Sequence, residues 1–234
     1  MDARAHERQR TPVHGLVTRR RARPAAHLLV LLVAASLLAG VAGGLLRLGI
    51  APASAPDWLG QAALHHGALM ICAFFGTVIG IERAVAVRAD WAWSAPVISG
   101  LAGLALLLGR HAAGAWLLVL ASLAFVAVNV LVVARQRAAH TVLLLASAFV
   151  WLTGNLSFAL GFTGPAVLPW WFAFLLMTVA AERLEMTRLM RRRTGAQLSL
   201  CLVLAGMLLA AAFSGSSPPA GGAAYGTGLV LLAA

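Results

Sequence analysis

Residues 112–134 read AAGAWLLVLASLAFVAVNVLVVA, a stretch without a single charged side chain, and Arg135 follows it directly. An α-helix needs about 20 mostly apolar residues to cross the roughly 30 Å hydrocarbon core of a bilayer. A run of this length exceeds any ordinary β-strand. The stretch therefore predicts a transmembrane helix.

Comparable apolar runs recur along the whole chain. A further run begins near Thr227 and stops at Ala234, too short to span a membrane. The chain therefore either ends in a stub or, as we favour, is a piece of a longer protein. The fold class predicted is an all-α polytopic membrane bundle with seven full spans and a truncated eighth. Besides residues 112–134, the predicted spans are 26–48, 62–87, 91–109, 140–162, 166–187 and 196–213.

Composition supports a lipid environment and argues against other classes. Apolar residues make up 61% of the 234 residues and charged residues 11%, whereas soluble domains carry about 25% charged residues. The net charge of +11 sits in short clusters between apolar runs, which favours a lipid bilayer over nucleic acid as partner. No loop is long enough for a soluble domain, and soluble-enzyme signatures are absent, so an enzyme is not expected.

The arginines predict one orientation. All 18 basic residues are Arg, and the span count puts sixteen on one side and only Arg47 and Arg110 on the other. Basic loops face the cytoplasm, so we expect a bacterial inner-membrane protein with a cytoplasmic N-terminus. The tail, residues 1–24, holds seven of these arginines and is expected to be disordered and to touch anionic lipid.

The first apolar stretch has a second interpretation as a signal peptide cleaved after Ala53-Ser54-Ala55. The stretch is long for a signal peptide, and its removal would leave an odd number of spans. A retained first helix is therefore favoured, and an intact N-terminus in mass spectrometry would support it.

Two dipeptides, Glu82-Arg83 and Glu182-Arg183, stand one hundred residues apart near the same end of the second and sixth predicted spans. Equal orientation four helices apart suggests a parallel tandem repeat of four-helix units, residues 25–138 and residues 139–234; chance is the alternative. The same alignment pairs Phe74 with Phe174 and Arg88 with Arg188.

These ionisable residues are the first candidates for function. A carboxylate at membrane depth costs about 2.5–3.5 kcal/mol on insertion scales, so something must offset that cost. One interpretation is ion pairing with arginines of neighbouring helices, and the other is a proton or cation site of a proton-coupled transporter. The candidates are Glu82, Arg83, Glu182, Arg183 and Glu185.

A histidine pair and a methionine form the second set. His65 and His66 begin the second predicted span, and Met70 lies four residues after His66, on the same helix face. Histidine and methionine suit Cu(I), and histidine suits haem iron. His111, near the same membrane face, is a further partner. An interfacial histidine pair that meets water or headgroups is the alternative.

Polar and small residues inside the spans predict helix packing. Asn129 and Asn155 are expected to form interhelical hydrogen bonds, with a ligand contact as the alternative. Gly40-x-x-x-Gly44 and Gly76-x-x-x-Gly80 predict close helix approach. Trp151 lies mid-span and is expected between helices. The other tryptophans predict interfacial belts: Trp58, Trp116, Trp170 and Trp171 at one face, Trp91 and Trp93 at the other.

The stretch from His66-Gly67-Ala68-Leu69-Met70 through Gly76-Thr77 to Arg83 resembles one helix of the NnrS family. That family consists of bacterial polytopic membrane proteins linked to haem, copper and nitric oxide stress. The resemblance covers roughly residues 62–95 and implies His66 as a haem or metal ligand. The chain departs from the family in lacking its His-x-His-Glu pattern and in carrying Glu82 before Arg83.

Three functions are consistent with these features. The first is a haem- or copper-associated membrane protein with His66 as ligand. The second is a proton-coupled secondary transporter that uses Glu82 and Glu182. The third is an accessory or assembly protein without chemistry of its own, in which the packing glycines matter and the histidines and glutamates do not.

Overall fold

The computed structural model describes residues 22–50, 56–162 and 164–186, together with residues 202, 205, 206 and 209. Within these residues the chain forms helices and short connections and no strand, which confirms the all-α class. The elements are α1 (Ala22–Arg47), α2 (Asp57–Leu64), η2 (Ala68–Phe75), α3 (Gly76–Val87), η3 (Asp90–Trp93), α4 (Ser94–Leu107), α5 (His111–Arg135), α6 (Ala139–Ala159) and α7 (Gly164–Met186).

Six helical stretches among the described residues are long and apolar enough to cross a membrane, and they match the first six predicted spans. Seven spans and a truncated eighth are thus not matched: apart from residues 202, 205, 206 and 209, the predicted span 196–213 lies outside the described residues, as does the whole segment from Thr227. Most of the basic tail lies outside them too, and α1 already begins at Ala22. The stretches are His27–Arg47, Ala68–Val87, Asp90–Leu107, His111–Arg135, Ala139–Ala159 and Ala166–Met186.

The predicted single helix over residues 62–87 is divided into three pieces. The α-helical pattern ends at Leu64, and His65 stands in a turn with φ −103° and ψ 19°. Ala68–Phe75 then forms a π-helix, the rare helix with i→i+5 hydrogen bonds, before α3 begins at Gly76. Periodicity at 3.6 residues per turn cannot reveal such a change, because Ala68–Phe75 is apolar throughout.

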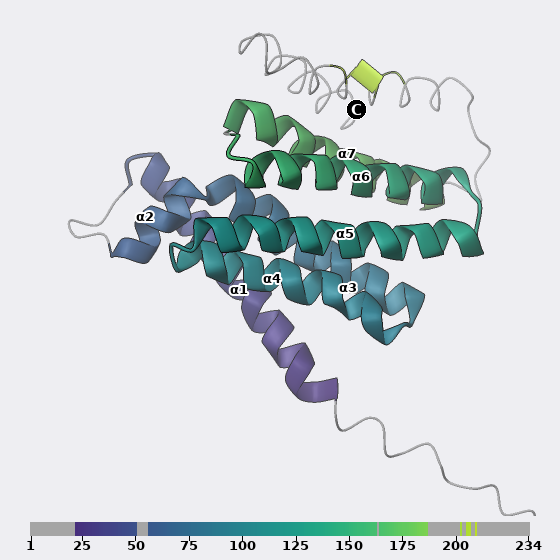
Figure 1. Ribbon diagram of the computed structural model, residues 1–234, viewed down its shortest axis with the longest axis horizontal. Helices are drawn as coiled ribbons and strands as arrows, with labels where there is room; N and C mark the ends of the chain where they lie inside the picture. The colour runs from purple at the N-terminus through teal and green to yellow at the C-terminus, as the bar shows by residue number, and fades with distance from the viewer. Residues whose placement is uncertain are drawn as a thin grey trace, which may run out of the picture.

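The long helices alternate in direction and form an antiparallel bundle (Figure 1). α4, α5, α6 and α7 pack in chain order, each against the next. We call the end that carries His65, His111 and Phe158 the histidine end, and the end that carries Arg83, Arg135 and Glu182 the arginine end. The two candidate centres therefore lie at opposite ends of the bundle.

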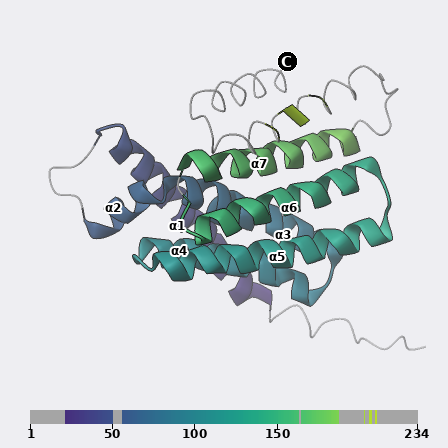
Figure 2. The ribbon, with the colours of Figure 1, turned by 45° about the horizontal axis from the view of Figure 1, so that its top comes forward.

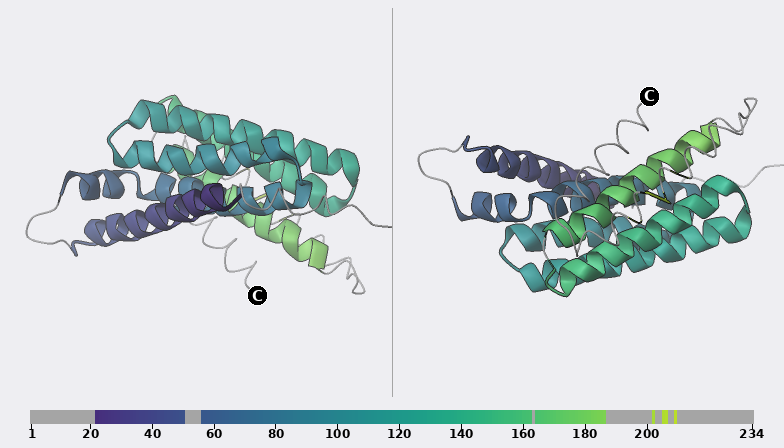
Figure 3. Two further views of the ribbon diagram at one scale, coloured as in Figure 1. Left: turned by 90° about the horizontal axis from the view of Figure 1, so that it is seen from below. Right: turned by 90° about the horizontal axis from the view of Figure 1, so that it is seen from above.

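α1 and α7 lie on different sides of the central helices (Figure 2). α1 packs against α2, η2 and α4, whereas α7 packs on α6 and also reaches η2. The views in Figure 3 show α1 beside α2 and show α7 crossing the bundle obliquely. The π-helical segment η2 thus lies between the first helix and the last described one.

The middle of the bundle is filled by aromatic side chains. Trp151 is 1% exposed and stacks on Phe174, with ring centroids 4.9 Å apart, while Phe125 meets both rings edge-on. This confirms the position predicted for Trp151. Trp171, predicted at the interface, is 3% exposed and belongs to the core.

Glycines let the helices approach this core. A Cβ placed on Gly76 would lie 2.6 Å from Trp151 Cζ2 and 3.1 Å from Ser99 Oγ, and one on Gly80 would lie 3.2 Å from Pro96. On α1, a Cβ at Gly40 would lie 2.6 Å from Met70 Sδ. Both Gly-x-x-x-Gly motifs therefore stand at close helix contacts, as predicted.

We predict that Gly76→Ala destabilises the protein. The added methyl group meets Trp151, which cannot retreat because Phe174 and Phe125 enclose it. Overpacking of this kind costs about 1–3 kcal/mol, so the thermal unfolding midpoint in detergent should fall. Gly60→Ala is the matched control, because a Cβ at Gly60 meets no atom within 4 Å. Equal midpoints for the two variants would contradict the prediction.

Candidate functional site

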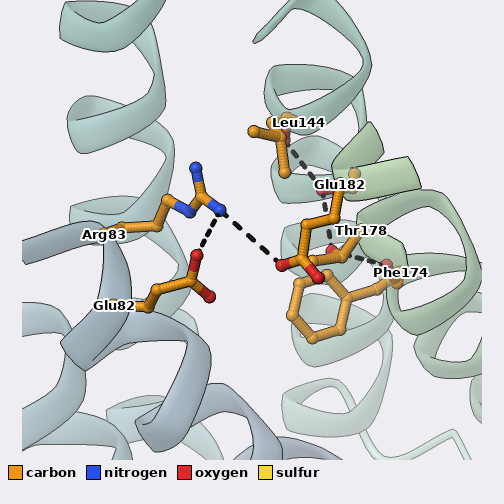
Figure 4. A network of polar contacts seen from close by, with 7 residues as sticks. Glu82, Arg83, Leu144, Phe174, Thr178 and Glu182 are labelled. Carbon is orange, nitrogen blue, oxygen red and sulfur yellow. Dashed lines mark hydrogen bonds and ion pairs between the residues drawn. The ribbon is translucent and has the colours of Figure 1, made fainter. Parts of the chain in front are cut away.

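Arg83 is the centre of a charged cluster at the arginine end. Its side chain is 9% exposed, and one nitrogen, Nη2, donates to Glu82 Oε1 at 2.8 Å and faces Glu182 Oε1 at 3.6 Å. Figure 4 shows the guanidinium of Arg83 between the two carboxylates. α3 supplies Glu82 and Arg83, and α7 supplies Glu182, so the ion pair joins two helices that are distant in sequence.

The contact involves Glu82 and Glu182, the two glutamates that the predicted repeat aligns. Glu82 and Glu182 both lie near the C-terminal ends of their helices and at the same end of the bundle. They converge on Arg83, whereas Arg183 and Glu185 are exposed on α7. An ion pair between neighbouring helices, which was one interpretation of the sequence, is therefore present between Arg83 and Glu182. The four-helix repeat stays a prediction.

Two hydroxyl groups join α6 and α7 near the charged cluster. Thr178, one turn before Glu182, donates to the Phe174 carbonyl at 2.9 Å and lies 3.3 Å from Ser147 Oγ on α6. Ser147 in turn donates to the Leu144 carbonyl at 2.7 Å. These contacts, drawn in Figure 4, fix the last turns of α7 against α6.

The arrangement leaves both charge and hydrogen-bonding capacity unsatisfied. Two carboxylates share one guanidinium, so the cluster carries one negative charge more than positive charge when both are ionised. Arg83 Nε is buried and has no hydrogen-bond partner. Unpaired buried polar groups are costly. The two carboxylates, which share one guanidinium, therefore have the capacity to take up a proton, whereas the N–H of Arg83 Nε lacks an acceptor.

A second polar network lies in the core and centres on Asn155. Its Oδ1 accepts from Trp171 Nε1 at 2.9 Å and from Cys72 Sγ at 3.3 Å, and its Nδ2 donates to the Leu118 carbonyl at 3.1 Å. Trp151 Nε1 also donates to Cys72 Sγ, at 3.4 Å. One amide thus connects η2, α5, α6 and α7, which confirms the interhelical role predicted for Asn155.

Asn129 behaves differently from the prediction. Its Nδ2 donates to the Phe125 carbonyl one turn earlier in the same helix, at 2.8 Å. Its Oδ1 is buried without a partner. Asn129 therefore makes no hydrogen bond to another described helix, because its short side chain folds back onto its own backbone.

At the histidine end, His66 and Met70 face α1. His66 Nδ1 lies 2.7 Å from the Gly40 carbonyl oxygen. A carbonyl only accepts, so Nδ1 carries the proton and Nε2 of the neutral ring keeps its lone pair. A Cβ on Gly44 would lie 2.9 Å from His66 Cε1, and Met70 Sδ lies against Gly40. The face shared by His66 and Met70, predicted from their spacing, is confirmed.

His65 points away from His66 and belongs to another contact. It is 5% exposed and stacks with His111 of α5, with ring centroids 5.2 Å apart, while Phe158 meets both rings edge-on. Burial, and then the neighbouring His111, lower the pKa of His65. His65 is therefore neutral at neutral pH, and its buried Nε2 has no partner.

The predicted metal ligands are thus divided between two faces. His66 and Met70 turn to α1, and His65 turns to α5. Among the described residues no three His, Cys, Asp or Glu side chains gather closely enough to hold a metal ion. A metal ion at His66 would therefore have few protein ligands among the described residues.

Sequence reasoning missed Cys72, Ser147, Trp171 and Thr178. A helical-spacing signal was present for most of them: Ser147, Trp151 and Asn155 recur every four residues on α6, and Trp171, Thr178 and Glu182 share one face of α7. Cys72 had no such signal, because it lies in the π-helical segment.

We predict that Asn155→Ala destabilises the protein more than Asn129→Ala. The first change leaves the buried Trp171 N–H without its acceptor and removes links to three other elements. Each unsatisfied buried group costs about 1–3 kcal/mol, whereas Asn129 gives up one bond within its own helix. Thermal unfolding in detergent measures the difference. An equal or larger loss for Asn129→Ala would contradict this account of the core.

Comparison with known proteins adds a family but no activity. Residues 26–234 match a family model described as a domain of unknown function (DUF8744). No curated protein and no solved structure matches the chain. The match covers most of the sequence and all six membrane-compatible helices. The chain is therefore a helical, membrane-compatible protein that belongs to the DUF8744 family.

Proposed function

We propose that the protein is a proton-coupled secondary transporter in which Glu82, Arg83 and Glu182 form the coupling site. The observation that carries the proposal is the convergence of two carboxylates from different helices on one buried guanidinium. Ionisable groups in membrane helices are rare, and they mark proton relays and substrate pathways. Loading one carboxylate with a proton changes the charge balance around Arg83 and hence the attraction between α3 and α7.

The orientation belongs to the same proposal. Arg83, Arg88, Arg135, Arg137 and Arg183 stand at the arginine end, and Arg47 and Arg110 stand at the histidine end. We place the arginine end in the cytoplasm of a bacterial cell and the helices in its inner membrane, following the distribution of arginine in membrane proteins. Labelling of a cysteine introduced at Gln136 from outside intact cells would contradict this placement.

The test of transport uses protons as the probe, because the substrate is not identified. The full chain is reconstituted into vesicles on a solid support, and a step in pH is applied while charge displacement is recorded. The wild type should give a transient current, which Glu182→Gln should abolish and Glu82→Gln should change. A glutamine keeps the shape of the side chain and cannot exchange a proton.

Glu185→Gln is the matched control, because Glu185 is exposed on the same helix and is absent from the ion-pair cluster. It should retain the current. The transport proposal would be removed if Glu82→Gln and Glu182→Gln both gave a transient current as large as that of the wild type. If the Glu82, Glu182 and His66 variants all behave like the wild type while Gly76→Ala impairs the function of the protein, an accessory or assembly role is supported instead.

A second candidate function is association with haem or copper, as the NnrS resemblance implies. The observation that favours it is the bond from His66 Nδ1 to the Gly40 carbonyl. Ligand histidines usually donate their second ring N–H to a carbonyl or carboxylate, which orients the ring. His66 Nε2 would hold the group, with Met70 Sδ on the same face. A bound haem iron or copper ion would supply electron-transfer or gas-binding chemistry.

Purified wild-type protein, His66→Ala and His27→Ala are compared by absorption spectroscopy and metal analysis. We expect a Soret band or bound copper in the wild type and in His27→Ala, since His27 is exposed at the far end of α1. His66→Ala should lose it. A wild-type protein with neither signal, after growth with both haem precursor and copper, would remove this candidate.

A further inference from the structure

The end of α3 has an unusual residue. Four described residues have a positive φ, and three of them are glycines that follow helix ends: Gly49 after α1, Gly109 after α4 and Gly161 after α6. The fourth is Arg88, with φ 57° and ψ 35°, directly after α3. Glycine is the usual residue at this position, because a Cβ disfavours the left-handed conformation. Arg88 thus stands at a position where glycine would be less strained.

Arg88 is one member of a basic surface at the arginine end. Arg135 Nη1 donates to the Val87 carbonyl at 2.9 Å, so the end of α5 lies against the turn that Arg88 forms. Arg137 follows in the connection to α6, and Trp91 stands three residues after Arg88 in η3. All four side chains are exposed. We call Arg88, Trp91, Arg135 and Arg137 the Arg88 patch.

Within the part of the chain that the structure describes, the charge of the patch is not neutralised. Asp90 is the one acidic residue between Glu82 and Glu182 in the sequence. No carboxylate in the described ranges forms an ion pair with Arg88, Arg135 or Arg137, whereas Arg83 is paired twice. Three arginines and a single acidic residue, Asp90, on segments that pack together give this surface a net positive charge, which attracts anions.

The position of the patch, at the ends of two membrane-compatible stretches, indicates which kind of anion it meets. α3 and α5 both belong to membrane-compatible stretches that end here, at Val87 and Arg135, and the ends of helices that cross a bilayer meet the polar headgroup region. The Trp91 ring is 47% exposed beside the arginines, and tryptophan favours the headgroup level because its ring is apolar and its N–H polar. Guanidinium groups bind phosphate through paired hydrogen bonds.

We propose that the Arg88 patch binds the phosphate headgroup of an anionic phospholipid and that this function explains arginine at the left-handed position. The site is separate from the Glu82–Arg83–Glu182 cluster and does not depend on transport. Backbone strain held at one residue points to a role for its side chain. The role assigned here is contact with the lipid surface at the turn that joins α3 to α4.

Arg88→Gly is the decisive variant. Glycine adopts the left-handed conformation without penalty, so the variant folds at least as well as the wild type. Full-length protein is purified in neutral detergent, and thermal unfolding is followed with added phosphatidylcholine or phosphatidylglycerol. The wild type should unfold at a higher temperature with phosphatidylglycerol. In Arg88→Gly the midpoint with phosphatidylcholine should equal or exceed that of the wild type, and the rise with phosphatidylglycerol should shrink.

Arg88→Gly/Arg137→Gln should lose more of that rise, with Arg135 kept because it also holds the Val87 carbonyl. Arg110→Gln, an exposed arginine at the histidine end, is the matched control and should keep the full rise. In a separate experiment, inorganic phosphate is added in place of lipid and the same unfolding midpoint is measured. The proposal is overturned if the wild type does not respond, if both patch variants keep the full rise, or if phosphate alone produces it.

Discussion

The amide of Asn155 is the interaction on which the arrangement of the bundle depends. In lipid the apolar surfaces of helices do not discriminate between partners, so polar contacts and close packing decide which faces meet. Asn155 accepts from η2 and α7 and donates to α5, which fixes three elements against α6. Thr178 and Ser147 add a second contact between α6 and α7 two turns away. The two contacts together set the rotation of α7, and that rotation turns Glu182 toward Arg83.

α7 also connects the two ends of the molecule. At the histidine end Trp171 packs on Phe158, which meets both His65 and His111. At the arginine end Glu182 meets Arg83. The histidine pair and the charged cluster lie at opposite ends of the bundle, so no single small ligand contacts both. A rigid movement of α7 would nonetheless change both sets of contacts at once, because one helix supplies residues to each.

Much of this architecture could be predicted from the sequence, and the reasons for the misses are specific. Long apolar runs give the helices, because burial of backbone groups in lipid leaves few alternatives. The choice of Glu82, Arg83 and Glu182 as candidates followed from the cost of charge in such runs. An ion pair with an arginine of a neighbouring helix was one interpretation of the sequence, but the choice of Arg83 as the partner of Glu182 did not follow, since helix rotation depends on Asn155 and the hydroxyl pair. The separation of His65 from His66 depends on a turn and a π-helix, and apolar periodicity carries no signal for either.

The close approach of α1 limits what His66 can bind. A Cβ at Gly44 would stand 3.7 Å from His66 Nε2 and 2.9 Å from its Cε1, so the backbone of α1 runs directly over the ring. An iron porphyrin bound at Nε2 would extend sideways from the iron far beyond the width of an imidazole, into the volume that α1 occupies. A single copper ion needs about 2 Å of bond length from nitrogen and a soft second ligand, and Met70 Sδ lies on the same face, one helical turn of α1 away from Gly44. Within the second candidate function, packing therefore favours copper over haem, and haem would require α1 to move away from α2 and η2.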